Sequence, residues 1–306
     1  MHPRSASGSE RDGGPRPPRT PYVGRLAPSP TGRVHQGTAR SFLAAWLDAR
    51  AHGGLLLFRN EDVDQARTIA GASDQIKRDL EWLGLDWDRE VPPQSERTER
   101  YAEAIRGLEG RVFPCTCTRK EVMQAPGAPR YPGTCRDGKP RNDRPASLRL
   151  RTHAGERARV RDRIAGDYEE DVHAEVGDFV LRRSDGVWAY QLAVTVDDLD
   201  QGVTSVVRGS DLASSAGRQA LLRKLIAPTS VPVDILHVPL FLHRPGVKLS
   251  KRDGATPVTE LGDPKLLIGA LARSLGIEAS DAAMPSDLLP AWGKAKLPTA
   301  DSVLPA

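Results

Sequence analysis

Long apolar runs are absent from this sequence, and this absence limits where the protein can reside. No stretch reaches the roughly 20 apolar residues that a helix needs to cross a bilayer. The two most apolar segments, 231–242 and 266–277, are short and contain Asp234, His237 and Arg273. The first twenty residues also lack the apolar core of a secretory signal. We therefore expect a cytoplasmic protein without membrane association.

Cysteine is scarce as well. The three cysteines all lie between positions 115 and 135, and this arrangement is unlike a disulfide framework. Thiols this close in sequence fit a metal site in a reducing compartment better. The formal net charge of +4 is too small to indicate a polyanionic partner by itself.

Positive charge is nevertheless concentrated in one segment. Between positions 136 and 163 there are ten Lys or Arg residues and four acids, a local excess of +6. The basic residues are Arg136, Lys139, Arg141, Arg144, Arg149, Arg151, Arg157, Arg159, Arg161 and Arg163. Such a segment suits contact with nucleic-acid phosphates, but a solvated arginine-rich surface explains it equally well.

The remaining composition, 39% hydrophobic and 27% charged residues, is typical of a globular protein. Residues 1–20 are rich in Gly, Pro, Ser and Arg, and we predict a disordered tail there. Apolar patterns then predict a strand at 22–27, a helix at 36–52, a strand at 55–59 and a helix at 69–83. This alternation is typical of a parallel α/β sheet.

The regular pattern breaks between about 110 and 176, where the cysteines, many prolines and the basic segment lie, so we interpret this part as an insertion. Further strands are predicted at 179–182, 187–196, 204–208 and 238–242, and a helix at 215–225. The expected organisation is a tail (1–20), two halves of one α/β domain (21–110 and 177–245), the insertion (111–176) and a loop-rich, weakly helical C-terminal part (246–306).

The loop between the first predicted strand and helix reads Pro28-Ser-Pro-Thr-Gly-Arg-Val-His35-Gln-Gly37-Thr38. It lies at the carboxyl edge of the sheet, where open α/β folds bind ligands. The amides of a helix N-terminus favour a phosphate there, and His35 can donate to phosphate oxygens. Gly37 allows a nucleotide close to the backbone. A single histidine at a helix start is usually structural, so this motif is weak evidence alone.

A second motif, Lys248-Leu-Ser250-Lys251-Arg252, follows the last predicted strand. Two lysines flanking a serine can stabilise charge that develops on leaving pyrophosphate, although such a run is usually only a basic loop. The two motifs are more than two hundred residues apart and frame one sheet. Together, the two motifs are a more specific indication of function than either motif alone.

The two motifs resemble the signatures of the class I aminoacyl-tRNA synthetases. His35-Gln-Gly37-Thr38 is similar to the HIGH signature, and Lys248-Leu-Ser250-Lys251-Arg252 is similar to KMSKS. Residues 25–32, 59–67, 190–198 and 202–209 are similar to blocks of the glutamyl subgroup, in the same order. The resemblance implies an α/β fold with a Rossmann-like parallel sheet, a zinc-bearing insertion and a short helical C-terminal stem-contact region. Asn60 departs from the subgroup, which usually has an apolar residue there.

The resemblance implies an enzyme that activates glutamate with ATP and magnesium. The implied glutamate-binding residues are Arg25, Ala27, Ser29, Glu61, Tyr190 and Arg208. The implied ATP-binding residues are His35, Gly37, Thr38, Lys248, Ser250 and Lys251, of which His35, Thr38 and Lys251 would be catalytic. Two guanidinium groups match the two carboxylates of glutamate. An arginine that faced an uncharged side chain would be buried without its counter-ion. Which arginine binds the side-chain carboxylate stays open, and no magnesium ligand can be assigned.

Cys115-Thr-Cys117 and Tyr131-Pro-Gly-Thr-Cys135 form a third group. Three thiols can hold zinc in a tetrahedral site if a fourth ligand exists, but no histidine lies between Phe113 and Arg136. The alternative is three buried thiols without a metal. A small relative of the glutamyl enzymes has a similar pattern, which implies one structural zinc ion bound by Cys115, Cys117, Tyr131 and Cys135.

Only 54 residues follow Arg252, too few for the large anticodon-binding domain of a glutamyl-tRNA synthetase. The chain therefore resembles a truncated paralogous family, the glutamyl-Q tRNA(Asp) synthetases. This resemblance implies a monomer that activates glutamate without tRNA and transfers it to the queuosine base in the anticodon of tRNA-Asp. The basic segment would then contact the anticodon stem-loop.

Three other functions stay open. A short glutamyl-tRNA synthetase would charge the 3′ end of tRNA-Glu. A non-catalytic, zinc-stabilised RNA-binding protein could retain the scaffold alone. A nucleotidylyltransferase on the same sheet would use a small-molecule acceptor, and its pyrophosphate exchange would not depend on an amino acid.

Overall fold

The computed structural model describes residues 21–138, 140–141, 143–244, 247–248 and 256–303. The predicted tail of residues 1–20 lies outside these ranges, and so do Ser250 and Lys251. Lys248 is described only in its backbone. Within the described ranges, no helix is both long enough and apolar enough to cross a membrane.

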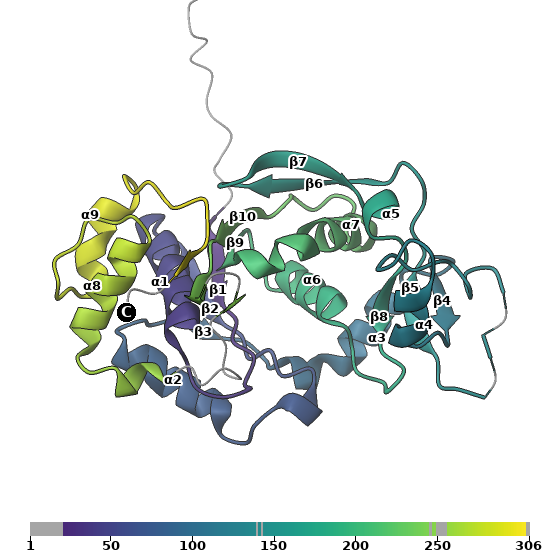
Figure 1. The fold of residues 1–306 in the computed structure, drawn as a ribbon, viewed down its shortest axis with the longest axis horizontal. Helices are drawn as coiled ribbons and strands as arrows, with labels where there is room; N and C mark the ends of the chain where they lie inside the picture. The colour runs from purple at the N-terminus through teal and green to yellow at the C-terminus, as the bar shows by residue number, and fades with distance from the viewer. Residues whose placement is uncertain (1–20, 139, 142, 245–246, 249–255, 304–306) are drawn as a thin grey trace, which may run out of the picture.

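The centre of the molecule is a row of strands flanked by helices (Figure 1). The described strands lie in the order β3 (Arg89–Glu90), β2 (Leu55–Phe58), β1 (Val23–Leu26), β9 (Ser205–Gly209), β10 (Asp234–Val238), β6 (Arg157–Asp162) and β7 (Gly166–Asp171). Paired neighbours run parallel except β6 and β7. β1 and β9 join the two paired groups, because the Thr204 N–H donates to the Val23 carbonyl at 3.0 Å. The predicted parallel α/β sheet is confirmed.

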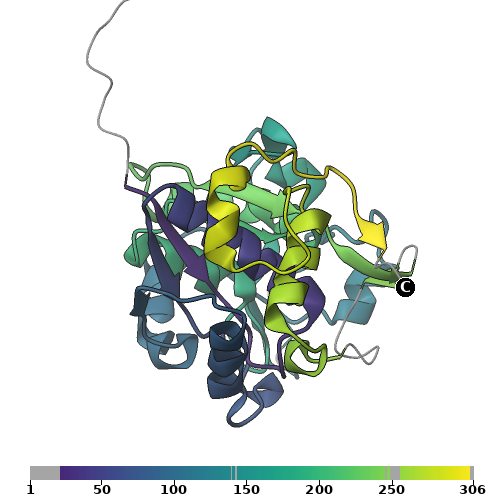
Figure 2. The ribbon, with the colours of Figure 1, turned by 90° about the vertical axis from the view of Figure 1, so that its left-hand side faces the viewer.

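Helices cover both faces of this sheet. Figure 1 shows α1, α8 and α9 on one side and α6 and α7 on the other, and Figure 2 shows α8 and α9 in front of α1. The helices are α1 (Gln36–Ala51), α2 (Ala72–Trp82), α3 (Thr98–Arg106), α6 (Tyr190–Asp200), α7 (Ala216–Ile226), α8 (Pro264–Ser274) and α9 (Leu289–Trp292). Short 3-10 turns are η1 (Gln65–Arg67), η2 (Gln94–Arg97), η3 (Ser210–Ser215), η5 (Val258–Glu260) and η6 (Pro285–Leu288).

The main core lies between the sheet and α1. The apolar stripe of α1 places Leu43, Trp46 and Leu47 in this core, where they meet buried side chains of β1, β2 and α8. A second core joins α3, α6 and α7. Because both sheet faces are covered, β2 is apolar throughout its length, as expected for a parallel strand buried on both sides.

A separate antiparallel sheet forms the insertion, at the right of Figure 1. Its strands are β4 (Val112–Cys115), β5 (Ser147–Leu150) and β8 (Phe179–Arg182), accompanied by the helices α4 (Arg119–Gln124) and α5 (Val172–Glu175). We expect the insertion at 111–176, but the strands of this segment do not all pair within one sheet. β6 and β7 extend the central sheet, whereas β8 belongs to the insertion sheet. Local pattern identifies a strand but not its partner.

One predicted strand is wrong, and another is divided into two. The apolar pattern predicts a strand at 187–196, but the segment that begins at Tyr190 is helix α6. Most of α6 is buried between the sheet and its neighbours, so tertiary packing overrides the β-branched composition. The predicted strand at 238–242 is divided by Pro239, which has no N–H for a ladder. β10 ends before it, and β11 (Phe241–Arg244) pairs instead with β12 (Val247–Lys248) and β13 (Ser302–Val303).

Candidate active site and thiol cluster

A cleft of about 1950 Å³ opens at the carboxyl edge of the central sheet and extends to the insertion. The residues from the expected site that line it are Arg25, Ala27, Ser29, His35, Gly37, Thr38, Glu61, Tyr190 and Arg208. The fold therefore brings together segments that are almost two hundred residues apart in the sequence. The side chain of Lys248 is not described, and Ser250 and Lys251 lie outside the described residues.

The loop before α1 is held in place from two directions. The Val34 N–H donates to Asp79 Oδ2 of α2 at 3.0 Å, and the Val34 carbonyl accepts from the Val258 N–H at 2.9 Å. At the helix start, Thr38 Oγ1 lies 3.0 Å from His35 Nε2. A Cβ on Gly37 would lie 3.2 Å from His35 Cε1, so glycine leaves room for the imidazole. The loop thus presents His35 and Thr38 on a fixed backbone.

Arg25 and Glu61 face the cleft from the ends of β1 and β2. The buried Arg25 guanidinium donates from Nη1 to the Val207 carbonyl at 3.0 Å. Its Nε has no hydrogen-bond partner among the described residues but lies 3.9 Å from Asp198 Oδ1, within ion-pair distance. Burial lowers the pKa of Arg25. Burial also raises the pKa of Glu61, although the positive charges of Arg59 and Arg25 oppose this rise. Arg25 and Glu61 therefore form a buried charged site in which the protein, among the described residues, does not satisfy every hydrogen-bonding group.

Arg59 is a central residue that the sequence did not single out as a site residue. It is fully buried and donates to Glu61 Oε1 from Nη2 at 3.0 Å and to Asp198 Oδ1 from Nη1 at 2.7 Å. Despite burial, these carboxylates raise the pKa of Arg59 above its ordinary value. The sequence signal was an Arg-Asn-Glu run at 59–61 and a pair of acids, Asp197 and Asp198, at the end of an apolar segment. The pairing of Arg59 with Asp198, 139 positions away, was not visible in the sequence.

Tyr190 and Arg208 close the other side of the cleft. Burial, followed by the negative charge of Glu61, raises the pKa of Tyr190, so its hydroxyl stays protonated. Arg208 donates from Nε to His237 Nε2 at 3.0 Å and from Nη1 to Gln219 Oε1 at 2.7 Å. Its Nη2 has no partner among the described residues. This side of the cleft thus combines a neutral hydroxyl with a cation that has free donors.

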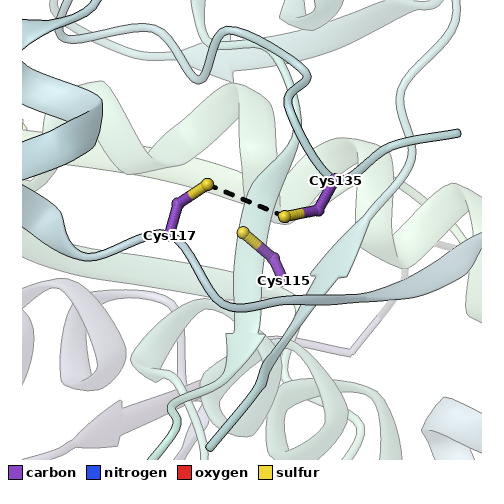
Figure 3. A group of neighbouring side chains, drawn as sticks. All are labelled: Cys115, Cys117 and Cys135. Carbon is purple, nitrogen blue, oxygen red and sulfur yellow. Dashed lines mark hydrogen bonds between the residues drawn. The ribbon is translucent and has the colours of Figure 1, made fainter. Parts of the chain in front are cut away.

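The three thiols lie together in the insertion (Figure 3). Their sulfur atoms are all within 4.8 Å of one another, and the Cys117 and Cys135 sulfurs are 3.7 Å apart. Tyr131 Oη lies 3.3 Å from the Cys115 sulfur and 3.9 Å from the Cys117 sulfur. Tetrahedral zinc with bonds of about 2.3 Å to sulfur separates its ligands by about 3.8 Å. The three sulfur atoms are therefore close enough together to bind one metal ion, and Tyr131 Oη lies beside two of them.

Most of the arginines in the basic segment are ion-paired. Those with a carboxylate partner are Arg136, Arg141, Arg144, Arg151, Arg157, Arg159, Arg161 and Arg163. The guanidinium of Arg149 lies 4.0 Å from the centre of the Tyr131 ring, and Lys139 lies outside the described residues. Several partners, such as Asp178 and Asp234, come from outside the segment. The local charge excess seen in the sequence is therefore largely compensated in the fold.

Comparison with known proteins agrees with this geometry. The family described as tRNA synthetases class I (E and Q), catalytic domain, matches residues 22–284. A glutamate-tRNA synthetase structure from Elizabethkingia anophelis superposes with a TM-score of 0.79 at 24% identity, covering 94% of this chain and 68% of that one. This likeness shows a shared fold. The chain is a class I synthetase and a ligase-type enzyme.

Several relatives with higher sequence identity to this chain share one name. A glutamyl-Q tRNA(Asp) synthetase from Deinococcus radiodurans is 47% identical over 289 residues, which are 89% of this chain and 96% of the relative. One from Bordetella bronchiseptica is 44% identical over 284 residues, 89% of this chain and 88% of the relative. The chain therefore belongs to the glutamyl-Q tRNA(Asp) synthetase family.

Proposed function

We propose that this enzyme activates L-glutamate with ATP and transfers it to the queuosine base in the anticodon of tRNA-Asp. The observation that carries the proposal is the convergence of Arg25, Glu61 and Arg208 in one cleft beside the His35 loop. The names of the relatives support the same substrate and acceptor.

Glutamate has two carboxylates and one ammonium group, and the cleft offers a complement for each. Arg25 and Arg208 each have a guanidinium nitrogen without a hydrogen-bond partner among the described residues, and these could donate to the carboxylates. Glu61 provides a carboxylate for the ammonium. Ser29, the Ala27 backbone and Tyr190 would fix the orientation. Glutamine would leave one buried guanidinium without an anion, which costs binding energy. The pocket therefore favours glutamate.

ATP would bind between the start of α1 and the loop that contains Lys248, Ser250 and Lys251. A carboxylate oxygen of glutamate attacks the α-phosphorus, a new P–O bond forms, and pyrophosphate leaves. His35 and Thr38 would stabilise the phosphate charge on one side, and Lys251 on the other. Gly37 admits the nucleotide to the backbone. Magnesium would accompany ATP and neutralise part of the pyrophosphate charge.

The acceptor would enter from the insertion side of the cleft. Small-molecule pockets occupy about 300–1,000 Å³, and this cleft is larger because it continues past the amino-acid pocket to Arg119, Met123 and Arg149. Since the basic segment is largely ion-paired, we assign the phosphate contacts to exposed arginines at the cleft, Arg67 and Arg119. A nucleophilic group of the modified base then attacks the acyl carbon, and AMP leaves.

The thiol cluster would hold one structural zinc ion through Cys115, Cys117, Cys135 and Tyr131. It lies in a small cluster of buried residues with Phe113 and Val122, where a metal crosslink would add stability. Zinc would fix the loop that forms one wall of the cleft and would take no part in catalysis.

Exchange of labelled pyrophosphate into ATP tests the activation step. Wild-type enzyme without RNA should catalyse exchange with glutamate and not with glutamine or aspartate. Arg25→Gln and Arg208→Gln should lose at least a hundredfold in kcat/KM, since each removes a charged hydrogen-bond partner. Arg106→Gln, an exposed change on α3, is the matched control. Exchange that does not require an amino acid would indicate a nucleotidylyltransferase.

Purified tRNA-Asp tests the acceptor. Transfer should occur to tRNA-Asp that contains queuosine and not to the same RNA with guanosine at that position. Equal transfer to both forms would contradict the assignment, and transfer to the 3′ end of tRNA-Glu would identify a short glutamyl-tRNA synthetase.

A further inference from the structure

Arg208 is connected to two buried polar residues on neighbouring strands. It lies on β9 directly opposite His237 of β10, and Asp162 ends the next strand, β6. Each of the three is at most 5% exposed. His237 and Asp162 have no expected role in substrate binding. Neither of them lines the cleft.

The hydrogen bonds determine the state of each group. A guanidinium N–H can only donate, so His237 Nε2 accepts from Arg208 Nε at 3.0 Å and must carry no proton. The proton is then on Nδ1, which donates to Asp162 Oδ2 at 2.5 Å. Asp162 Oδ1 accepts from the backbone N–H groups of Ile164 and Ala165 at 2.9 and 3.1 Å. Burial lowers the pKa of His237, consistent with a neutral imidazole.

This arrangement orients Arg208 without neutralising it. Its Nε and Nη1 are fixed by two uncharged groups, the His237 imidazole and the Gln219 amide. Among the described residues, no carboxylate lies within ion-pair distance of Arg208. Arg59, in contrast, is paired directly with Glu61 and Asp198. Arg208 therefore faces the cleft with its charge uncompensated and with free N–H groups on Nη2.

We propose that His237 and Asp162 are positioning residues that hold the charged Arg208 guanidinium toward a carboxylate of the amino-acid substrate. The inference rests on the proposed glutamate activation. A carboxylate in direct contact with Arg208 would orient it equally well but would compete with the substrate for its charge. The neutral imidazole separates the two functions, because it aligns the guanidinium while Asp162 keeps the imidazole in the required tautomer.

Kinetic constants of full-length variants test this role. His237→Leu removes the acceptor, whereas His237→Gln retains an amide oxygen that can accept from Arg208. In pyrophosphate exchange, His237→Leu should raise the KM for glutamate by about tenfold to a hundredfold, the effect of losing a hydrogen bond to a charged group. The KM for ATP should not change. His237→Gln should recover most of the loss, and His153→Leu, at an exposed position, should match wild type.

An unchanged KM for glutamate in His237→Leu, or an equal rise in both KM values, would overturn the inference. If His237→Leu does not fold, as judged by circular dichroism, Asp162→Asn takes its place, because it keeps the size of the side chain and removes the charge. Asp162→Asn should raise the KM for glutamate severalfold, and an unchanged value would also overturn the inference. Failure of the proposed function is a separate result, since wild-type enzyme would then show no glutamate-dependent exchange.

Discussion

Replacing Arg59 by methionine should reduce both the stability of the protein and the binding of glutamate. Arg59 is fully buried, and its guanidinium forms ion pairs with Glu61 at 3.0 Å and Asp198 at 2.7 Å. Methionine fills much of the same space but leaves these carboxylates without their cation. The variant therefore tests the effect of the Arg59 charge separately from the effect of its side-chain volume.

The expected loss of stability is large. Removing one partner of a buried ion pair costs about 3–5 kcal/mol, compared with a total stability of about 5–15 kcal/mol for a typical domain. Over most of this stability range the variant should therefore remain folded and measurable. Arg59→Lys retains the charge but not the planar fork, so its loss should be smaller. Arg106→Met, on the exposed surface of α3, should change the free energy of unfolding by less than about 0.5 kcal/mol.

The same variant should acquire a pH dependence. Burial already raises the pKa of Glu61, and Arg59 opposes that rise. Without Arg59 the Glu61 carboxyl would be protonated at higher pH and could not pair with the substrate ammonium. Over a pH range that covers the loss of activity in both proteins, exchange by Arg59→Met should therefore be lost at a higher pH than exchange by wild type.

Urea unfolding and exchange rates across this pH range are the measurements. If Arg59→Met is as stable as Arg106→Met, then the ion pairs of Arg59 with Glu61 and Asp198 do not stabilise the fold. If its pH profile matches that of wild type, then Arg59 does not keep Glu61 ionised.

Three further predictions concern other parts of the molecule. Asp48→Asn should lower the free energy of unfolding by about 3 kcal/mol at neutral pH, because buried Asp48 loses its ion pair with Arg163. This ion pair lowers the pKa of Asp48 despite burial, so the stability difference between wild type and variant should shrink as the pH falls below 3.8, the ordinary pKa of an aspartate. Urea melts at two pH values would show this. Metal analysis of wild type should find one zinc ion per chain. Cys117→Ser should lose zinc and melt at a lower temperature but keep its KM for glutamate. A wild-type chain without zinc would contradict the proposed zinc site. Arg67→Glu combined with Arg119→Glu should leave exchange unchanged and lower transfer to tRNA by about tenfold or more at low salt, whereas unchanged transfer would place the RNA elsewhere.

The parts of the fold that the sequence predicts well depend on local signals. The first strand, the His35 loop, α1 and β2 follow from apolar period and turn residues, and the structure confirms them. The convergence of Arg25, Glu61 and Arg208 follows from a sheet whose strand ends share one edge. Each of these features is determined by residues close together in sequence or by the general geometry of an α/β sheet.

The features that sequence reasoning missed depend on distant partners. His237 lies inside an apolar segment and has no distinguishing local pattern, and its role becomes visible only beside Arg208 and Asp162 on adjacent strands. The basic segment gave a strong charge signal, but acids such as Asp178 compensate it after folding. Strand pairing and ion pairing are set by tertiary contacts, so they could not be inferred from the pattern of one chain.

Transfer of labelled glutamate to total tRNA from the same cell tests the central claim most directly. The label should appear only in queuosine-containing tRNA-Asp, and it should attach equally well when the 3′ ends have first been oxidised with periodate. Label at the 3′ end of tRNA-Glu, abolished by periodate, would contradict the proposed acceptor and would make this enzyme a short glutamyl-tRNA synthetase.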